Sequence, residues 1–347
     1  MRRRRSEAGV IHPGTRSPAS PRGRRRLPVG GHRRTGILLG ALALLALAPL
    51  PARAQGTTSP EGAADLLIPT GARSMGIGQA AAALEGGSES LWWNPAGLAR
   101  LARPEAAVHH AQTLAFTGDL LAFAFPRQPF GVVTVGANLV NYGEQEITDD
   151  QTHEVIGTFQ MRSTVFAAAY STPLGHVLNA GITYKVLRFH FESSVATTSA
   201  VDLGVQGRHA VAGGELSLGA ALRNVGLRLQ FKDEQQADPL PTRLDLGVAY
   251  ARTLETVAPG LAATASFDVV TGPRTAAVGV RAGGELSWQR KYHARAGYAN
   301  QSNVASGPSL GVGLDAGRFT LDIARVFDEI NTQNGTPPTF FSLRVHF

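Results

Sequence analysis

The chain has 347 residues, enough for one large domain or two ordinary ones. It contains no cysteine, which excludes disulfide bonds, cysteine-ligated zinc, iron–sulfur clusters and thiol catalysis. After residue 54 no apolar run reaches the ~20 residues that a membrane-spanning helix needs, so a polytopic helical membrane protein is excluded as well.

The positive charge of the chain is concentrated in its first 54 residues. They hold 12 of the 33 Lys and Arg residues and a single acid, Glu7. The remainder carries 21 basic and 25 acidic residues, a net charge of −4. The pI of 10.2 for the whole chain is therefore no argument for nucleic-acid binding, and we expect no nucleic-acid partner.

The first 54 residues read as a basic extension followed by a signal peptide. Arg33 and Arg34 precede an apolar stretch at 37–48, and Ala52-Arg53-Ala54 has the small residues of a cleavage site. A membrane anchor, the alternative, would need a longer apolar span. We therefore predict cleavage after Ala54 and a mature protein that works outside the cytoplasm. The Arg- and Pro-rich residues 1–28 add nothing that a signal peptide needs.

Residues 55–103 differ from the rest of the chain and are predicted to form a plug-like N-terminal segment. They are rich in Ala and Gly, and short helices are expected at 80–85 and 96–102. Pro95 suits the first turn of the second helix, and Asn94 suits its N-cap.

From residue 104 to the end, apolar residues recur with a period of two. In 132–140, for example, Val133, Val135, Ala137 and Leu139 alternate with polar or small residues. Repetition of this pattern in segments of ~10 residues is typical of a transmembrane β-barrel. About fourteen segments are predicted, at 104–112, 118–126, 129–142, 160–171, 177–190, 199–208, 214–226, 241–251, 261–270, 274–286, 291–299, 308–316, 318–327 and 339–347.

The connectors between these segments agree with an outer-membrane barrel that has both termini in the periplasm. Such a barrel alternates long outside loops with short periplasmic turns. The long connectors 143–159, 227–240 and 328–338 all fall on the outside, and the tight ones, at Pro126–Phe130, Ser287–Arg290 and Gly317, fall on the other side.

The C-terminal segment supports a membrane barrel over a soluble sandwich or propeller. In it, Phe341, Leu343, Val345 and Phe347 share one face. We expect this face to contact outer-membrane lipid and to act as the signal read by the barrel-assembly machinery. Closure into a barrel is required because every backbone polar group must be paired in hydrocarbon.

Three stretches carry information beyond the strand pattern. The first contains Gly71, Arg73, Gly76 and Gly78, the second is Asn94-Pro95-Ala96-Gly97, and the third runs from 238 to 250. Together they resemble the PorV/PorQ family of outer-membrane barrels, which are similar to the FadL fatty-acid transporters. The resemblance covers about 60–347. It implies fourteen strands and an N-terminal segment that enters the barrel mouth from the periplasm.

The roles of the motif residues stay open between packing and ligand contact. Gly76, Gly78 and Gly97 permit tight turns and close packing, and Asn94 suits a cap, so we expect a structural role. Direct contact with a ligand is the alternative.

The resemblance implies a non-enzymatic component of type IX protein secretion that shuttles or anchors secreted proteins. Its partners would be cargo proteins and secretion-system subunits, contacted through 143–159 and 227–240. A FadL-like channel for small hydrophobic molecules is the alternative, and it predicts inward apolar residues at mid-height. The register places mostly Gly, Ala, Thr and charged residues inside. A barrel with a purely structural role is a third possibility.

Several motifs that suggest other chemistry are set aside, and no cofactor or metal is expected. Gly307–Gly311 matches G-x-S-x-G, but a strand follows it where a nucleophile elbow needs a helix. Gly76 to Ala81 imitates a dinucleotide fingerprint without a preceding strand. His109 and His110 are neighbours on a strand, so they face opposite sides.

Three acids are expected to face the barrel interior: Asp245, Asp315 and Asp322. They could set the polarity of a pore. More simply, they would form hydrogen bonds that fill the lumen.

Overall fold

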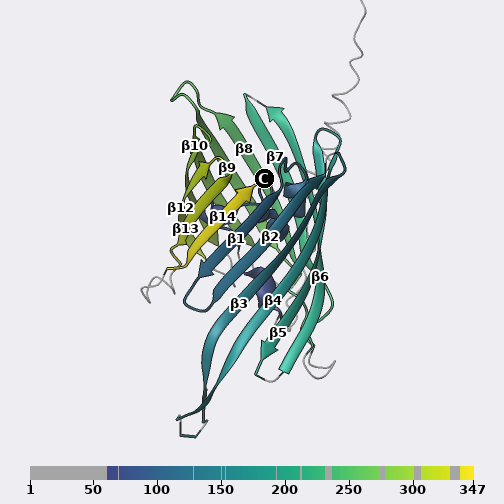
Figure 1. Ribbon diagram of the computed structural model, residues 1–347, viewed down its shortest axis with the longest axis vertical. Coiled ribbons are helices and arrows are strands. Elements are labelled where there is room, and N and C mark those ends of the chain that lie inside the picture. Colours follow the sequence, from purple (N-terminus) through teal and green to yellow (C-terminus); the bar gives the residue numbers. More distant parts are fainter. Residues whose placement is uncertain are drawn as a thin grey trace, which may run out of the picture.

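A computed structural model of the protein describes residues 61–68, 70–127, 129–149, 151–152, 154–192, 194–211, 213–230, 237–273, 278–300, 306–328 and 337–347. The predicted extension and signal peptide, 1–54, lie outside these residues. Fourteen antiparallel strands form a closed barrel in which each strand pairs with its sequence neighbours and β1 pairs with β14 (Figure 1). The predicted fold class and strand number are confirmed.

All fourteen strands overlap the predicted segments, and β3, β4, β6 and β10 differ most, by five or six residues at one end. Their bounds are β1 Glu105–Gln112, β2 Thr117–Arg127, β3 Gly131–Thr148, β4 Val155–Leu174, β5 Leu178–Phe191, β6 Ser194–Val211, β7 Gly214–Gly226, β8 Arg243–Thr253, β9 Leu261–Thr271, β10 Gly279–Trp288, β11 Tyr292–Asn300, β12 Gly307–Ala316, β13 Phe319–Val326 and β14 Thr339–His346.

The period of two in the sequence becomes a division between the two faces of the barrel wall. Along β2 almost every second residue is buried, and the intervening Leu121, Phe123 and Phe125 are exposed on the outer face. The same outward apolar face recurs around the barrel, as expected of a wall surrounded by lipid.

The two ends of the barrel differ in their connections. At the turn end, where β1 begins and β14 finishes, β2–β3, β10–β11 and β12–β13 are joined by the predicted tight turns. At the opposite end, called the loop end here, lie the connectors 227–242 and 327–338, of which 231–236 and 329–336 fall outside the described residues.

The predicted outside loop at 143–159 is wrong for most of its length. β3 and β4 continue through it, and Ile147 still pairs with Gly157 beyond an irregularity at Gly143. This hairpin projects past its neighbours at the loop end (Figure 1). None of the described residues of this hairpin is buried, so neither face requires apolar side chains and the sequence pattern did not reveal the strands.

Residues 61–103 lie inside the barrel as a plug segment (Figure 1). It contains four short helical elements, η1 Ala64–Leu67, α2 Ala72–Gly76, α3 Ser90–Trp93 and η2 Pro95–Leu98. The helix expected at 96–102 is present only as η2, and the one expected at 80–85 is wrong. None of the helices in the described part of the chain is long and apolar enough to span a bilayer.

The plug segment runs from the loop end to the turn end. At its start, the backbone N–H of Gly62 donates to Pro239 O in the β7–β8 connector. After the plug, β1 begins at the turn end, where the Phe347 N–H donates to Pro104 O. Residue 61 and the C-terminus therefore lie at opposite ends of the barrel. The prediction that both termini share the periplasmic side concerned the mature N-terminus, which lies outside the described residues.

Candidate functional site

The inner wall of the barrel receives the plug segment through glycines. At these positions an added Cβ would meet plug atoms at or below about 3 Å, so only Gly allows the plug backbone to approach. They are Gly136, Gly181, Gly204, Gly219, Gly247, Gly283, Gly297 and Gly311, on eight strands between β3 and β12 and facing plug residues between Gly76 and Ala96. The high glycine content of the chain thus has a specific structural use.

Gly78 shows how closely the plug approaches the wall. Its φ of 67° lies in the left-handed region, and an added Cβ would come within 2.5 Å of Tyr298 N on β11. Gly76 packs against Gly311 of β12 in the same way, and its carbonyl accepts a hydrogen bond from Ser309 Oγ at 3.3 Å. The glycines of the first motif are therefore points of contact between the plug and the wall.

Asn94 connects two parts of the plug. Its side-chain oxygen accepts a hydrogen bond from Ala96 N at 3.1 Å, and Pro95 occupies the first turn of η2, as predicted for a cap. Its amide nitrogen donates to Ala82 O at 2.7 Å. Asn94 is fully enclosed, so the loss of these bonds would leave buried polar groups without partners.

The remaining motif residues also contact protein atoms. Gly71 faces the side chain of Glu89, and Gly97 faces Ser90. Arg73 reaches the barrel wall, where its guanidinium lies 3.2 Å from the Glu285 carboxylate of β10. This carboxylate raises the pKa of Arg73 above its ordinary range. Whether any of these residues contacts a ligand stays a prediction.

The wall formed by β10 to β14 carries a buried chain of charges that begins at Arg73. Glu285 also accepts from Arg295 Nε at 2.5 Å, and Arg295 donates to Asp322 at 2.6 Å. Arg344 then donates to the second oxygen of Asp322 at 2.8 Å. This network fixes the plug to one side of the lumen.

A second group of charges surrounds the two tryptophans of the plug. Arg223 lies 2.8 Å from Asp245, and both Arg223 and Arg281 lie over the Trp93 ring. Lys185, which pairs with Asp202 at 2.5 Å, lies over the Trp92 ring. The positive charges therefore have both carboxylate and aromatic partners.

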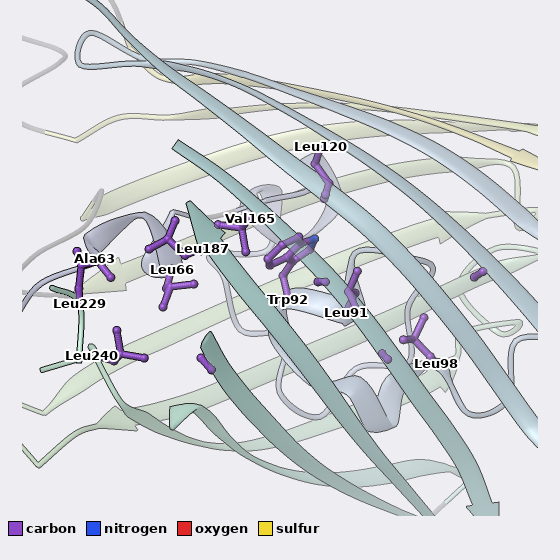
Figure 2. Close-up of a cluster of buried hydrophobic side chains, with 14 of the residues drawn as sticks. Ala63, Leu66, Leu91, Trp92, Leu98, Leu120, Val165, Leu187, Leu229 and Leu240 are labelled. Carbon is purple, nitrogen blue, oxygen red and sulfur yellow. The ribbon is translucent and has the colours of Figure 1, made fainter. Parts of the chain in front are cut away.

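Beside the Lys185–Asp202 pair, the lumen between β2 and β6 also holds an apolar cluster. Figure 2 shows a buried cluster that starts at the loop end with Ala63, Leu229 and Leu240 and reaches Leu98 of η2. The wall contributes leucine and valine side chains to it, namely Leu120, Val132, Val165 and Leu187. An apolar seam therefore runs along β2 to β6, interrupted by the Lys185–Asp202 pair, and the charge network lies along β10 to β14.

Sequence reasoning placed the inward acids correctly. Asp245 and Asp322 are buried inside the barrel, and Asp315 accepts hydrogen bonds from Thr320 and pairs with His293. It missed Leu120, Val165 and Leu187, because the expected interior was mostly small or charged. The sequence did hold a sign of these residues in β4 and β5, because both faces of these strands contain apolar residues.

The C-terminal residues lie as predicted on the outer face. Phe341, Leu343 and Phe347 are exposed, and Val345 is half-buried beside them. The intervening Ser342 and Arg344 point inside. The role of this face as an assembly signal stays a prediction.

The motifs set aside earlier have structural positions. Ser309 lies within β12, which continues as a strand to Ala316. His109 is buried, whereas the neighbouring His110 is half-buried and pairs with Asp119. Within the described ranges, no group of three or more His, Asp and Glu side chains is arranged to hold a metal.

The comparisons with known proteins identify a fold. No protein-family model matches the chain, and neither does any curated protein. Among solved structures, the CymD monoaromatic hydrocarbon channel is similar, with a TM-score of 0.50 and 12% identity over 82% of this chain and 98% of CymD.

Two further structures are similar at lower scores. A Pseudomonas aeruginosa FadL homologue has a TM-score of 0.46 and 12% identity over 84% of this chain and 99% of its own. CdiB from Acinetobacter baumannii has a TM-score of 0.40 and 10% identity over 71% of this chain, which spans only 60% of CdiB. The closed wall, its apolar outer face and the enclosed plug give the chain the fold of an outer-membrane β-barrel, which it shares with CymD.

Proposed function

We propose that the protein is a non-enzymatic outer-membrane channel that passes small hydrophobic molecules along the apolar seam of its lumen. The observation that carries the proposal is the continuous cluster from Ala63 and Leu240 at one end to Leu98 near the other (Figure 2). A lumen that only needed filling could be closed by hydrogen-bonded polar groups, as it is on the β10 to β14 side. These side chains are packed against one another, so a hydrophobic molecule would bind along them only after the plug has shifted.

The plug must shift for a molecule to pass, and its first part is held differently from the rest. The segment 61–68 is attached by an ion pair between Glu61 and Arg243 and by hydrogen bonds from Tyr142 and Ser163 to Asp65. Residues 76–96 are instead locked against the glycines of the wall. We infer that 61–68 is the part that moves when a ligand enters.

The similarity to CymD supports the proposal only through the fold. CymD is a monoaromatic hydrocarbon channel, and it shares the closed barrel at 12% identity. We place the loop end outside the cell and the turn end, with the C-terminus, in the periplasm, because outer-membrane barrels have long loops outside and short turns inside.

Uptake measurements test this function. Cells that lack the gene and express either the wild-type protein or Leu187→Glu are given a small hydrophobic compound, and its intracellular appearance is followed. We expect wild-type uptake to exceed that of empty-vector cells and Leu187→Glu to abolish the excess, since a charge would interrupt the seam. A matched control is Arg188→Glu, which changes a charge at the exposed neighbour on β5. Equal uptake by wild-type and empty-vector cells would reject the channel.

Type IX protein secretion is the second candidate, and one observation favours it. The projecting hairpin of β3 and β4 exposes Val155 and Ile156, the latter 65% exposed, beyond the neighbouring strands. Exposed apolar side chains of this kind suit contact with another protein. Together with the PorV/PorQ-like motifs, they fit a barrel that shuttles secreted cargo.

Affinity purification distinguishes this candidate from the channel. The intact protein is extracted gently from its own membrane as wild type and as Val155→Ser with Ile156→Ser. The secretion function predicts secreted proteins bound to the wild type and lost from the variant. If the host encodes no family of proteins with a shared sorting domain, the candidate fails.

A further inference from the structure

A wide pocket lies at the turn end of the barrel, with about 1230 Å³ of empty space that is open to solvent. Three cationic side chains line it. Arg103 follows the plug, and Arg290 and Lys291 belong to the turn between β10 and β11. Thr320 of β13 and His346 of β14 line its wall. The pocket is thus formed by segments that are far apart in the sequence.

The three cations of this pocket have no carboxylate partners among the described residues. The Lys291 ammonium lies 5.2 Å from the centre of the Tyr292 ring. Asp315 is the one acid among the described lining residues, and its oxygens are already engaged. Its Oδ1 accepts a hydrogen bond from Thr320 at 2.5 Å, and its Oδ2 lies 3.1 Å from His293. Positive charge is therefore in excess, and such a pocket attracts an anion.

The turn that carries Arg290 has a backbone that does not suit its residues. Gln289 and Arg290 have φ angles of 54° and 55°, in the left-handed region. Asn and Gly usually occupy the two positions of such a hairpin turn, because other residues are strained there. Both side chains are exposed, so packing does not explain their presence, and both line the pocket. A break of a local rule of this kind is typical of a functional position.

Aromatic side chains place the pocket at the level of the lipid headgroups. Trp288 and Tyr292 flank the turn at 289–291, Phe319 follows the turn at 317–318, and Phe347 ends the chain. All four are between 45% and 66% exposed. Aromatic residues on the outer face of a membrane barrel gather at the membrane–water interface. The cations beside them therefore lie where the phosphate groups of the adjacent leaflet are.

We propose that this pocket binds the phosphate of an anionic phospholipid from the inner leaflet of the outer membrane. The acyl chains lie against the outer face beside Trp288 and Phe319, and the headgroup bends over the short turns into the pocket. Arg103 and Arg290 each offer a planar guanidinium that can bind two phosphate oxygens, and Lys291 adds a third charge. The proposal does not depend on what passes through the lumen. It rests on the placement of the turn end in the periplasm.

Titration with two lipids tests the site. The intact protein in detergent micelles is mixed with phosphatidylglycerol or with phosphatidylcholine that has the same acyl chains. Native mass spectrometry measures the bound fraction at each lipid concentration. Both lipids contain a phosphate, but only phosphatidylglycerol has a net negative charge. We expect its Kd to be at least tenfold lower, and equal affinities would overturn the proposal.

Paired substitutions show whether the pocket causes this preference. Arg103→Gln with Arg290→Gln removes two of its charges and should reduce the preference to twofold or less. The matched control is Arg127→Gln with Arg252→Gln, which removes two exposed cations from the same end of the barrel, outside the pocket. It should keep the tenfold preference. A preference that survives in the pocket variant, or falls equally in the control, would overturn the site.

Arg290→Gly separates lipid binding from folding. Glycine accepts the left-handed backbone, so the variant should resist urea at least as well as the wild type. Its preference for phosphatidylglycerol should nevertheless fall by threefold or more. If Arg290 serves only the turn, the preference stays at the wild-type value, and that result would contradict the proposal.

Competition with the headgroup alone distinguishes a lipid from a soluble anion. Glycerophosphoglycerol carries the same phosphate as phosphatidylglycerol but has no acyl chains. In hundredfold excess over the lipid it should displace only a minor part of the bound phosphatidylglycerol. Complete displacement would show that the pocket takes a soluble phosphate compound, and the lipid proposal would be rejected.

Discussion

Arg73 of the plug and Glu285 of β10 form an ion pair at 3.2 Å, although 212 residues separate them in the chain. Glu285 is at the same time bound to Arg295 at 2.5 Å. The pair therefore joins the plug to the charge network of the wall. This contact is the best single point at which to test whether the plug is held by the barrel.

Replacement of Arg73 should destabilise the protein strongly. Arg73→Gln leaves Glu285 with one cationic partner in a largely buried site, and removal of one partner of such a pair costs about 3 kcal/mol. Urea unfolding followed by tryptophan fluorescence measures the loss. Arg208→Gln is the control, because its pair with Glu85 also joins plug and wall but is about a third exposed on each side. It should cost less than about 1 kcal/mol. Equal losses in the two variants would contradict the structure.

Two adjacent glycines of β10 should respond differently to alanine. An added Cβ at Gly283 would meet the backbone of Ile77, whereas at Gly284 the nearest atom is Thr264 O at 3.5 Å. Gly283→Ala should therefore cost about 1–3 kcal/mol through overpacking and should loosen the plug. Single-channel conductance in planar bilayers should rise for Gly283→Ala and stay at the wild-type value for Gly284→Ala. Identical conductances would show that the plug does not rest on Gly283.

The cap at Asn94 should hold the plug closed. Asn94→Ala with Pro95→Ala removes the bond to Ala96 and the bond to Ala82, and it leaves buried groups unpaired at a cost of about 1–3 kcal/mol each. We expect higher conductance and greater antibiotic uptake. The control is Asn141→Ala, which removes an exposed side-chain bond to Gly143 N. If neither conductance nor uptake changes in the double variant, the two residues only assist packing.

Burial of Glu89 should make stability depend on pH. The side chain is 3% exposed, and its loss of hydration raises its pKa, while the charges of Arg344 and Arg73 oppose the shift. The folded protein then holds a proton at pH values above about 4.5, where the unfolded chain has released it. Stability should therefore fall as the pH rises from that value through the raised pKa.

Glu89→Gln isolates this effect. The variant should lose the decline of unfolding free energy with pH, because an amide binds no proton there. Glu85→Gln, in the exposed part of the plug, should keep it. The measurement is urea unfolding at a series of pH values. If the unfolding free energy of Glu89→Gln depends on pH as it does in the wild type, Glu89 is not the cause of the pH dependence.

The last residue should matter for assembly more than for packing. Phe347 is 66% exposed on the outer face, beyond the end of β14. Its deletion should lower the fraction of protein that folds in outer membranes, as measured by heat-modifiable mobility on gels. Phe347→Tyr retains an aromatic ring and should fold like the wild type. Normal folding of the deletion would contradict the assembly signal.

The barrel was predictable because its constraint is local in sequence. Apolar residues must face lipid at every second position, so Val133, Val135 and Leu139 revealed both the strand and its register. The same argument failed at 143–159, where β3 and β4 extend with water on both faces. Alternation of apolar and polar residues indicates a strand only where one of its faces contacts lipid.

The interior was less predictable because its contacts are distant in sequence. The Ala-rich stretch 80–85 has a high helix propensity, yet its backbone bonds to the wall: Ala82 N donates to Asp268, and Gln206 donates to the carbonyls of Ala82 and Leu84. These partners lie more than 120 residues away. The sequence marked the glycines of the wall, but only the plug against them explains their positions.

Native mass spectrometry of the protein, extracted gently from its own outer membrane, tests the central claim most directly. A channel with an apolar seam should carry the added mass of a small organic molecule, and Leu187→Glu should lose it. Added mass that corresponds to whole secreted proteins, without any small molecule, would contradict the channel and favour the cargo shuttle.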